Sequence, residues 1–194
     1  MAEGRAVTRL WLVRHGPTRT KAMIGHTDRP ADLSDRAALR RLSEALPDAP
    51  VVSSDLRRAL GTADAIRGDR PRLPPDPRLR EFHYGAWEGL TFAQIEAAHG
   101  EGSARPFFET PGDHRPPGGE SWNDVAARVV AALDDHADHR ELIVVCHFGV
   151  ILILYARAAG IAPEDALSRP VEPLSLTRLD WGARGGVHFV GETP

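Results

Sequence analysis

The sequence predicts an α/β fold, a three-layer α/β/α sandwich with a mainly parallel central sheet. Short apolar runs alternate along the chain with segments whose apolar residues recur at helical spacing, as in a parallel sheet with crossover helices. Residues 142–146, Leu-Ile-Val-Val-Cys, are apolar throughout, which is typical of a strand buried on both faces of such a sheet. A length of 194 residues, 42% of them hydrophobic, suits one substantial core, so we expect a single domain over residues 1–194.

The first half of the chain predicts two strands and two helices. The apolar run 8–13 ends abruptly at Arg14, which indicates a strand that enters a tight loop. Apolar residues at helical spacing predict helices over residues 34–46 and 54–66, with a brief buried strand at residues 51–52 between them. In the first of these helices, the apolar residues at helical spacing are Ala38, Leu42, Ala45 and Leu46.

The second half predicts three more helices and a closing hairpin. A capping-box pattern opens a helix over residues 91–98. Residues 100–119 are rich in Gly and Pro, so we expect a long irregular loop, of the kind that is usually functional in a compact domain. Another helix begins at Ser121, and an apolar helix follows the strand described above and runs to about Ala159. Two short apolar runs joined by a Gly-rich turn predict a hairpin over residues 174–190.

Composition and charge argue against several classes of protein. The formal net charge is −3 and the pI is about 6.3, whereas proteins that bind nucleic acid or acidic membranes usually carry a basic excess. No apolar run reaches the roughly 20 residues that a membrane-spanning helix needs. Residues 1–9 are polar and lack the apolar core of a signal peptide, so we expect a cytoplasmic protein. The lone cysteine, Cys146, cannot form an intramolecular disulfide.

Three predicted strands end in residues that bring charge or nucleophilic chemistry. Arg14-His15 follow the first strand, residues 53–58 follow the second, and His147 follows the third. Ligands bind at the carboxyl ends of parallel strands, so we expect these residues at one site. A phosphate monoester is close to a dianion and needs several fixed cations and donors, and a neutral imidazole is a nucleophile. A loop histidine, a helix cap or a solvated arginine would explain each feature singly, but their joint occurrence favours a phosphate site.

Five motifs, in order along residues 10–155, resemble those of the histidine phosphatase superfamily, which includes the cofactor-dependent phosphoglycerate mutases. The matching segments are Leu12–Thr18 with its Arg-His-Gly signature, Ser54–Ala63 (S-x-L-x-R-A-x-x-T-A), Leu79–Gly89 (L-x-E-x-x-x-G-x-W-E-G), Pro117–Ser121 (P-G-G-E-S) and Val144–Ile151 around a second histidine. The register of the second motif selects Arg58 rather than Arg57 as a phosphate ligand. One such motif alone would be a weak signal, whereas five in family order are specific.

The resemblance implies a role for each matched residue. His15 is the nucleophile that becomes phosphorylated. Glu81 protonates the leaving oxygen and then, as a carboxylate, activates the water that hydrolyses the phosphohistidine. The other contacts to phosphate are assigned to Arg14, Thr18, Arg58 and His147. The resemblance also implies that His147 is protonated and that neither a metal nor another cofactor is required, since basic side chains neutralise the phosphate.

The chain departs from the family pattern at two positions. Lys21 stands where many members have asparagine, and it either adds to the positive charge at the phosphate or lies in solvent. Phe148 stands where members often have glycine, so it would narrow or line the pocket and alter the choice of substrate. His26 and Asp28 have the side chains of metal ligands, but no third ligand appears at a recognisable spacing. By the same resemblance, His26 is expected near the pocket rim.

The function expected from these residues is hydrolysis of a small phosphate monoester. The alternative is a phosphoglycerate mutase. The resemblance implies, however, that mutases of the family have longer chains, with an insertion after the catalytic glutamate. Here about 30 residues separate Gly89 from Ser121, and only Arg105 and Arg115 in this stretch are basic enough to bind a carboxylate. A noncatalytic phosphate sensor would be expected to lack one of the catalytic residues. The sequence leaves open the physiological substrate (a sugar phosphate, phosphoglycerate, α-ribazole phosphate or a phosphoprotein) and the oligomeric state.

Overall fold

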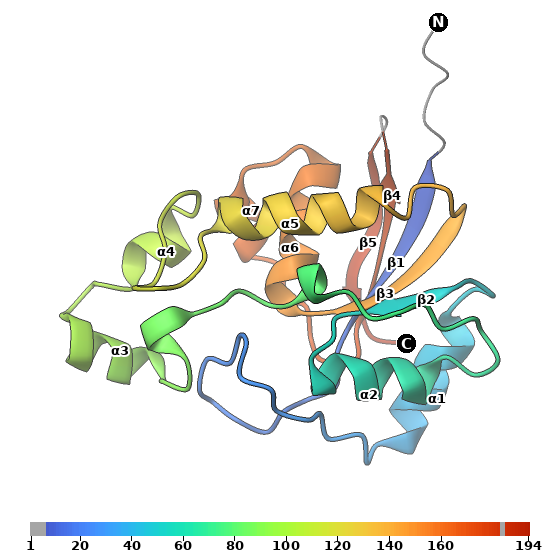
Figure 1. The fold of residues 1–194 in the computed structure, drawn as a ribbon, viewed down its shortest axis with the longest axis horizontal. Helices are drawn as coiled ribbons and strands as arrows, with labels where there is room; N and C mark the ends of the chain where they lie inside the picture. Colours follow the sequence, from blue (N-terminus) through green and yellow to red (C-terminus); the bar gives the residue numbers. More distant parts are fainter. Residues whose placement is uncertain (1–6, 183–184) are drawn as a thin grey trace, which may run out of the picture.

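A five-stranded sheet in the order β2-β3-β1-β4-β5 forms the centre of the computed structural model, which describes residues 7–182 and 185–194 (Figure 1). Its strands are β1 (Thr8–Arg14), β2 (Val51–Ser53), β3 (Glu141–Cys146), β4 (Leu176–Trp181) and β5 (Gly186–Glu192). The order interleaves the two halves of the chain, because β2 from the first half pairs with β3 from the second.

The sheet is mixed, whereas the sequence predicts a mainly parallel one. β3 pairs in parallel with both β1 and β2. β4 runs antiparallel to β1, and β5 antiparallel to β4. The predicted closing hairpin is confirmed, and it accounts for the antiparallel pairing of β5 with β4. A connection of a few residues permits only antiparallel pairing, since a parallel neighbour needs a crossover of about a dozen residues or more.

The five predicted helices are present, together with two short ones. The helices are α1 (Arg36–Ala45), α2 (Arg57–Ile66), α3 (Phe92–His99), α4 (Arg105–Glu109), α5 (Trp122–Asp134), α6 (Phe148–Ala159) and α7 (Pro163–Leu167), with 3-10 turns at Pro77–Leu79 and Gly85–Trp87. α4 lies within the segment for which an irregular loop is predicted. Five residues span little more than one turn, which is too short for an apolar period to show in the sequence.

Alternate residues of β3 belong to two different cores. Leu142 and Val144 pack with residues of α5 and α6, whereas Ile143 and Val145 pack with residues of α1 and α2. Helices therefore cover both faces of the sheet (Figure 1). Of the apolar residues whose spacing predicts α1, Ala45 is exposed.

The carboxyl ends of the three parallel strands meet at one edge of the sheet. The register aligns Arg14 of β1 with Cys146 of β3. Just beyond the strands, the backbone N–H of His15 donates to Cys146 O at 3.0 Å and that of Ser54 donates to Val145 O at 3.0 Å. These bonds fix the starts of three chemically important loops relative to one another.

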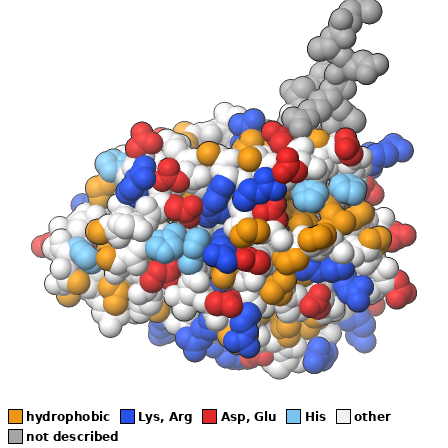
Figure 2. Space-filling model, viewed as in Figure 1, with side chains coloured by type: hydrophobic (Ala, Val, Ile, Leu, Met, Phe, Trp, Pro, Cys, Tyr) orange, Lys and Arg blue, Asp and Glu red, His pale blue; other side chains and the backbone are white. Residues whose placement is uncertain are grey.

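The surface mixes charges of both signs. In Figure 2 basic and acidic side chains are interspersed over the face shown. Among the described residues, no helix is long and apolar enough to cross a bilayer.

Candidate active site

His15 is held in one tautomer by the loop that follows β1. Its side chain is buried, and ring atom Nδ1 lies 2.7 Å from the carbonyl oxygen of Gly16. A carbonyl can only accept, so Nδ1 carries the proton and Nε2 carries a lone pair. The Gly16 N–H in turn donates to Thr62 Oγ1 at 3.0 Å, which ties the loop to α2. The first histidine therefore presents Nε2 as a potential nucleophile.

Arg58 lies between the two predicted histidines. It is fully buried, and its Nε is 3.2 Å from His15 Nε2 and 3.3 Å from His147 Nδ1. The two imidazole rings are 5.0 Å apart between centroids. The terminal nitrogens of Arg58 donate to the carbonyls of Gly25 at 2.6 Å and Thr27 at 3.0 Å. Arg58 thus joins the strand-end loops to the 25–27 loop, whereas its neighbour Arg57 is exposed.

Two buried donors at this edge have no hydrogen-bond partner among the described residues. Since His147 Nδ1 accepts from Arg58, its Nε2 carries a proton, and this N–H is unpaired in a fully buried side chain. The Nε of Arg14 is unpaired too, although Nη1 donates to Val171 O at 2.6 Å and the guanidinium lies 5.2 Å from the centre of the Phe148 ring. Leaving a buried donor unpaired costs about 1–3 kcal/mol, so these groups favour an acceptor such as an anion.

Burial and neighbouring positive charge keep both histidines neutral. Burial, reinforced by Arg58 and Arg14, lowers the pKa of His15 to about 3. Burial, reinforced by His15 and Arg58, also places the pKa of His147 well below its ordinary value. The neutral state suits His15 as a nucleophile. Without a bound phosphate, burial and the nearby Arg58 oppose the protonation of His147 that the family resemblance implies. A bound phosphate dianion would favour protonation of His147.

These lowered pKa values predict acid sensitivity of the fold. Between pH 6.5 and about 3, His15 is protonated in the unfolded chain but neutral in the folded one. The unfolded state then binds more protons, so the free energy of unfolding falls as the pH falls through this window. Between pH 7 and pH 5, the free energy of unfolding of the parent protein should fall. For His15→Gln we expect this fall to be smaller by about 2 kcal/mol, as measured by urea unfolding at both pH values. Equal losses would contradict a neutral buried His15.

Glu81 approaches the same edge from the segment after the first 3-10 turn. Its Oε2 accepts from the backbone N–H of Gly149 at 3.1 Å, and its Oε1 accepts from that of Phe82 at 3.0 Å. A Cβ at position 149 would lie 2.5 Å from Glu81 Oε1 and 2.4 Å from Phe82 Cε2. Gly149 is therefore required for the carboxylate to reach the start of α6, two residues after His147.

Arg128 holds the Glu81 segment in place through hydrogen bonds. The sequence analysis does not predict this role. Its guanidinium donates to the carbonyls of Arg78, Arg80 and Glu81 at 2.7, 2.7 and 2.9 Å. It also forms a bidentate ion pair with Glu120, both contacts being 2.8 Å long. Glu120 is consequently a structural partner rather than a free acid. Nothing in the sequence distinguishes Arg128, the one arginine of α5, from the arginines elsewhere in the chain.

Glu88 holds the 25–27 loop in place through hydrogen bonds. It is a second positioning residue that the sequence does not predict. Its carboxylate accepts from the backbone N–H groups of Gly25 at 3.1 Å and His26 at 2.7 Å, and from the Thr27 hydroxyl at 2.8 Å. Burial acts to raise its pKa, but these donors outweigh burial and lower it. Glu88 is thus held as a carboxylate, and its acceptor positions are occupied.

The residues considered as metal ligands make other contacts. His26 Nε2 lies 3.1 Å from the backbone carbonyl oxygen of Glu81, and Asp28 Oδ1 accepts from the Arg57 backbone N–H at 2.7 Å, where α2 begins. Within residues 7–182 and 185–194, no three His, Cys, Asp or Glu side chains are grouped closely enough to hold a metal ion. The structure gives His26 a position at the rim of the site.

Among the described residues, no hydrogen bond or ion pair joins the side chains of Thr18 and Lys21 to the other predicted ligands. Thr18 is half-buried and Lys21 is exposed. In the part of the chain described, the side chains of both lack hydrogen bonds and ion pairs to other residues. Their contact with phosphate stays a prediction, whereas Arg14, His15, Arg58, Glu81 and His147 form one cluster.

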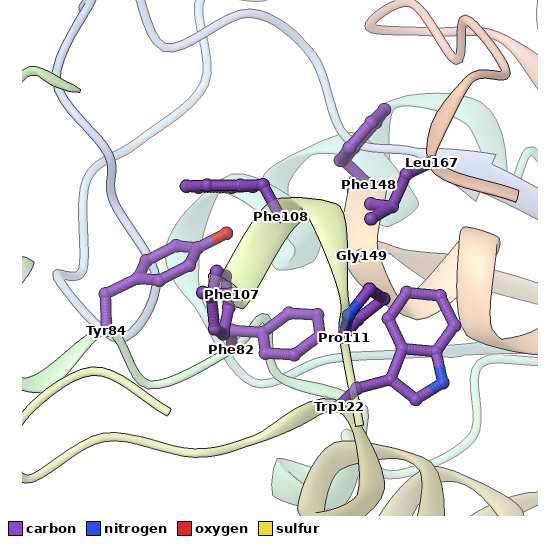
Figure 3. Close-up of a pocket in the computed structure, with 9 residues that line it drawn as sticks. All are labelled: Phe82, Tyr84, Phe107, Phe108, Pro111, Trp122, Phe148, Gly149 and Leu167. Carbon is purple, nitrogen blue, oxygen red and sulfur yellow. The ribbon is translucent and has the colours of Figure 1, made fainter. Parts of the chain in front are cut away.

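An apolar cavity of about 310 Å³ adjoins this cluster. Figure 3 shows the side chains that line it. Gly149, which donates to Glu81, is part of its wall. Phe148 also lines it and lies beneath the guanidinium of Arg14. Phe148 thus lines a cavity beside the cluster, and its effect on the choice of substrate stays a prediction.

Comparison with known families agrees with this geometry. The family described as histidine phosphatase superfamily (branch 1) matches residues 10–190. The chain belongs to this superfamily. The match extends from β1 to the closing hairpin, and so it includes all five residues of the cluster.

Named relatives of this histidine phosphatase include phosphatases. Glucosyl-3-phosphoglycerate phosphatase of Mycolicibacterium vanbaalenii is 38% identical over 180 residues, covering 82% of this chain and 77% of that one. Phosphoglycerate mutase-like protein 4 of Arabidopsis thaliana is 35% identical over 165 residues, covering 76% and 69%. A solved mycobacterial glucosyl-3-phosphoglycerate phosphatase with VO3 superposes with a TM-score of 0.81 at 31% identity, covering 95% and 98%. The predicted family and its phosphatase class are confirmed.

Proposed function

We propose that this protein hydrolyses phosphate monoesters through a phosphohistidine formed on His15. One observation supports the proposal most strongly: the lone pair of His15 Nε2 and two unpaired N–H donors lie at the same edge of the sheet. Nε2 of neutral His15 faces Arg58, while the buried N–H groups of Arg14 and His147 have no partner among the described residues. A phosphoryl group would accept from these donors while presenting phosphorus to the nucleophile.

The first step would transfer the phosphoryl group to the enzyme. The lone pair of His15 Nε2 forms an N–P bond as the P–O bond of the ester breaks. Glu81 gives its proton to the leaving oxygen, which departs as an alcohol. Arg14, Arg58 and His147 hold the equatorial oxygens, on which charge is spread in the transition state.

The second step would release inorganic phosphate. The Glu81 carboxylate takes a proton from water, the water oxygen attacks phosphorus, and the N–P bond breaks to restore neutral His15. Both steps use one carboxylate in opposite protonation states, so Glu81 must be held close to the bond that changes. Its bond to the Gly149 N–H, next to the catalytic histidine loop, supports this placement.

The mutase alternative has less support. Its substrate would need a cation for the phosphoglycerate carboxylate, but the two arginines of the 100–119 segment are engaged. Arg105 pairs with Glu109 at 3.5 Å, and Arg115 pairs with Asp124 at 3.1 Å. Neither arginine lines the apolar cavity beside the cluster.

We further propose that residues 1–194 form one domain with the expected three layers. The interleaved strand order supports a single domain, and the cores on opposite faces of the sheet support the layers. A small phosphate monoester is the proposed partner, and the cytoplasm is the proposed location.

The test is to trap the intermediate. After brief incubation with ³²P-labelled substrate in the presence of EDTA and a rapid quench, we expect a phosphoenzyme that is acid-labile and base-stable. Peptide mapping should place the label on His15. Label on Cys146, a serine or an aspartate, or loss of labelling in EDTA that Mg²⁺ or Zn²⁺ restores, would contradict the mechanism.

A further inference from the structure

We propose that the apolar cavity beside the cluster binds the leaving alcohol and selects monoesters of aromatic or bulky apolar alcohols over those of acidic sugars or glycerates. This inference rests on the proposed phosphatase function and specifies its substrate class. It differs from what the names of the mycobacterial relatives suggest, since glucosyl-3-phosphoglycerate is polar and carries a carboxylate.

The walls of the cavity are made almost entirely of apolar side chains. The lining residues come from the 82–84 segment, from helices α4 to α7 and from the loop that follows α4, and Figure 3 shows them converging. They are Phe82, Tyr84, Phe107, Phe108, Pro111, Trp122, Phe148, Gly149 and Leu167. None of them carries a formal charge at neutral pH. The polar side-chain atoms among them are the Tyr84 hydroxyl and the Trp122 indole nitrogen, which can orient an apolar guest but cannot neutralise a carboxylate.

The cavity is placed to receive the group that leaves. Gly149 contributes its N–H to Glu81, the proposed proton donor, and also forms part of the cavity wall. Phe82 directly follows Glu81, and Phe148 directly follows His147. Burial, with the charges of Glu81 and Glu88, raises the pKa of Tyr84 well above its ordinary value, so this hydroxyl remains neutral beside the catalytic carboxylate. The group bonded to the protonated oxygen would therefore enter an uncharged space.

The size of the cavity fits one ring system. Its volume of about 310 Å³ is at the lower end of the roughly 300–1,000 Å³ range of small-molecule pockets. Aromatic rings that contact one another hold this shape: the Phe107 ring lies 5.5 Å from that of Phe82 and 5.0 Å from that of Phe108, between centroids. Burying a phenyl group here would remove its apolar surface from water without uncovering any charge of the protein.

The experiment compares three substrates of the purified enzyme: 2-phenylethyl phosphate, ethyl phosphate and 3-phosphoglycerate. The first two release primary alcohols of similar acidity, so their ratio of kcat/KM reports binding of the ring. We expect 2-phenylethyl phosphate to exceed ethyl phosphate by about 30-fold or more, the factor that burial of about 100 Å² of apolar surface gives. We expect it to exceed 3-phosphoglycerate as well. A ratio near one, or a preference for 3-phosphoglycerate, would overturn the inference.

Two matched variants locate the effect. Phe108→Ala removes a half-buried ring from the cavity wall and should lower the ratio of the phenylethyl to the ethyl ester about fivefold or more. Phe189→Ala removes a half-buried ring that packs against Trp11 on β1, away from the cavity, and should leave the ratio unchanged. Equal ratios in both variants would contradict the assignment of this cavity.

A binding measurement does not depend on either variant or on turnover. The parent protein should be inhibited by 3-phenylpropylphosphonate at a concentration at least about tenfold lower than by propylphosphonate. Equal inhibition would overturn the inference. Failure of the proposed function looks different, because the enzyme would then hydrolyse neither ester and form no phosphoenzyme with nitrophenyl phosphate.

Discussion

His15→Ala is expected to lower kcat/KM for phosphate monoesters by about 10⁴-fold or more, as loss of the nucleophile does in other enzymes with covalent intermediates. The bond from Nδ1–H to Gly16 O aims Nε2 at the edge where Arg58 and His147 meet, and a pKa of about 3 keeps that nitrogen unprotonated at neutral pH. Alanine removes the nucleophile and leaves the positive charges in place. The loss should be measured with both alkyl and nitrophenyl phosphates.

The matched control is His136→Ala. His136 is half-buried and, like His15, has a lowered pKa, caused first by burial and then by His139, but it lies outside the cluster, after α5. We expect this variant to keep the parent activity. If folded His15→Ala retained more than about a tenth of the activity, another residue would have to be the nucleophile.

The sequence predicts the frame of this protein well because the frame depends on local patterns. The capping boxes that open α3 and α5, the apolar strand β3 and the short run of β1 each carry their own signal over a few residues. The mixed sheet is different. Strand direction depends on which strands become neighbours, and the pairing of β4 with β1 joins segments about 170 residues apart. α4 and α7 have five residues each and are fixed by packing rather than by period.

The candidate site divides in the same way. Arg14, His15, Arg58, Glu81 and His147 are identified by motifs, and the structure brings them together. No motif identifies the groups that position these residues. Each of those groups is a common residue type, and it contacts a partner that is distant in the sequence. Arg128 reaches three backbone carbonyls of the Glu81 segment, and Val171 supplies a carbonyl to Arg14 across 157 residues. The apolar cavity is likewise assembled from five separate segments, so no stretch of sequence shows it.

Replacing Glu81 should produce the second large effect on activity. The two roles of Glu81 depend differently on how readily the alcohol leaves. As general acid it matters most when the alcohol is a poor leaving group, since an alkoxide of high pKa cannot depart unprotonated. Nitrophenolate departs without that help. As general base Glu81 is needed for hydrolysis of phosphohistidine, whatever the first substrate was.

Glu81→Gln is therefore expected to slow alkyl phosphates by about 10²-fold or more. With nitrophenyl phosphate it should give a burst of about one product per active site and then slow turnover as phosphohistidine accumulates, which rapid-mixing absorbance measurements detect. Because the carboxylate accepts from both Phe82 N–H and Gly149 N–H, the amide of the variant loses one of these bonds. Some loss of stability is expected for this reason and should be measured alongside.

Glu88→Gln separates that structural loss from the chemical one. Glu88 also accepts backbone N–H bonds, from Gly25 and His26, but in our proposal it only positions the 25–27 loop that Arg58 holds. It should slow the alkyl and nitrophenyl esters by similar factors and give no burst. If Glu81→Gln behaved in this way and Glu88→Gln gave the burst, the two glutamates would have to exchange roles. If neither variant gave a burst, the acid and base would lie elsewhere.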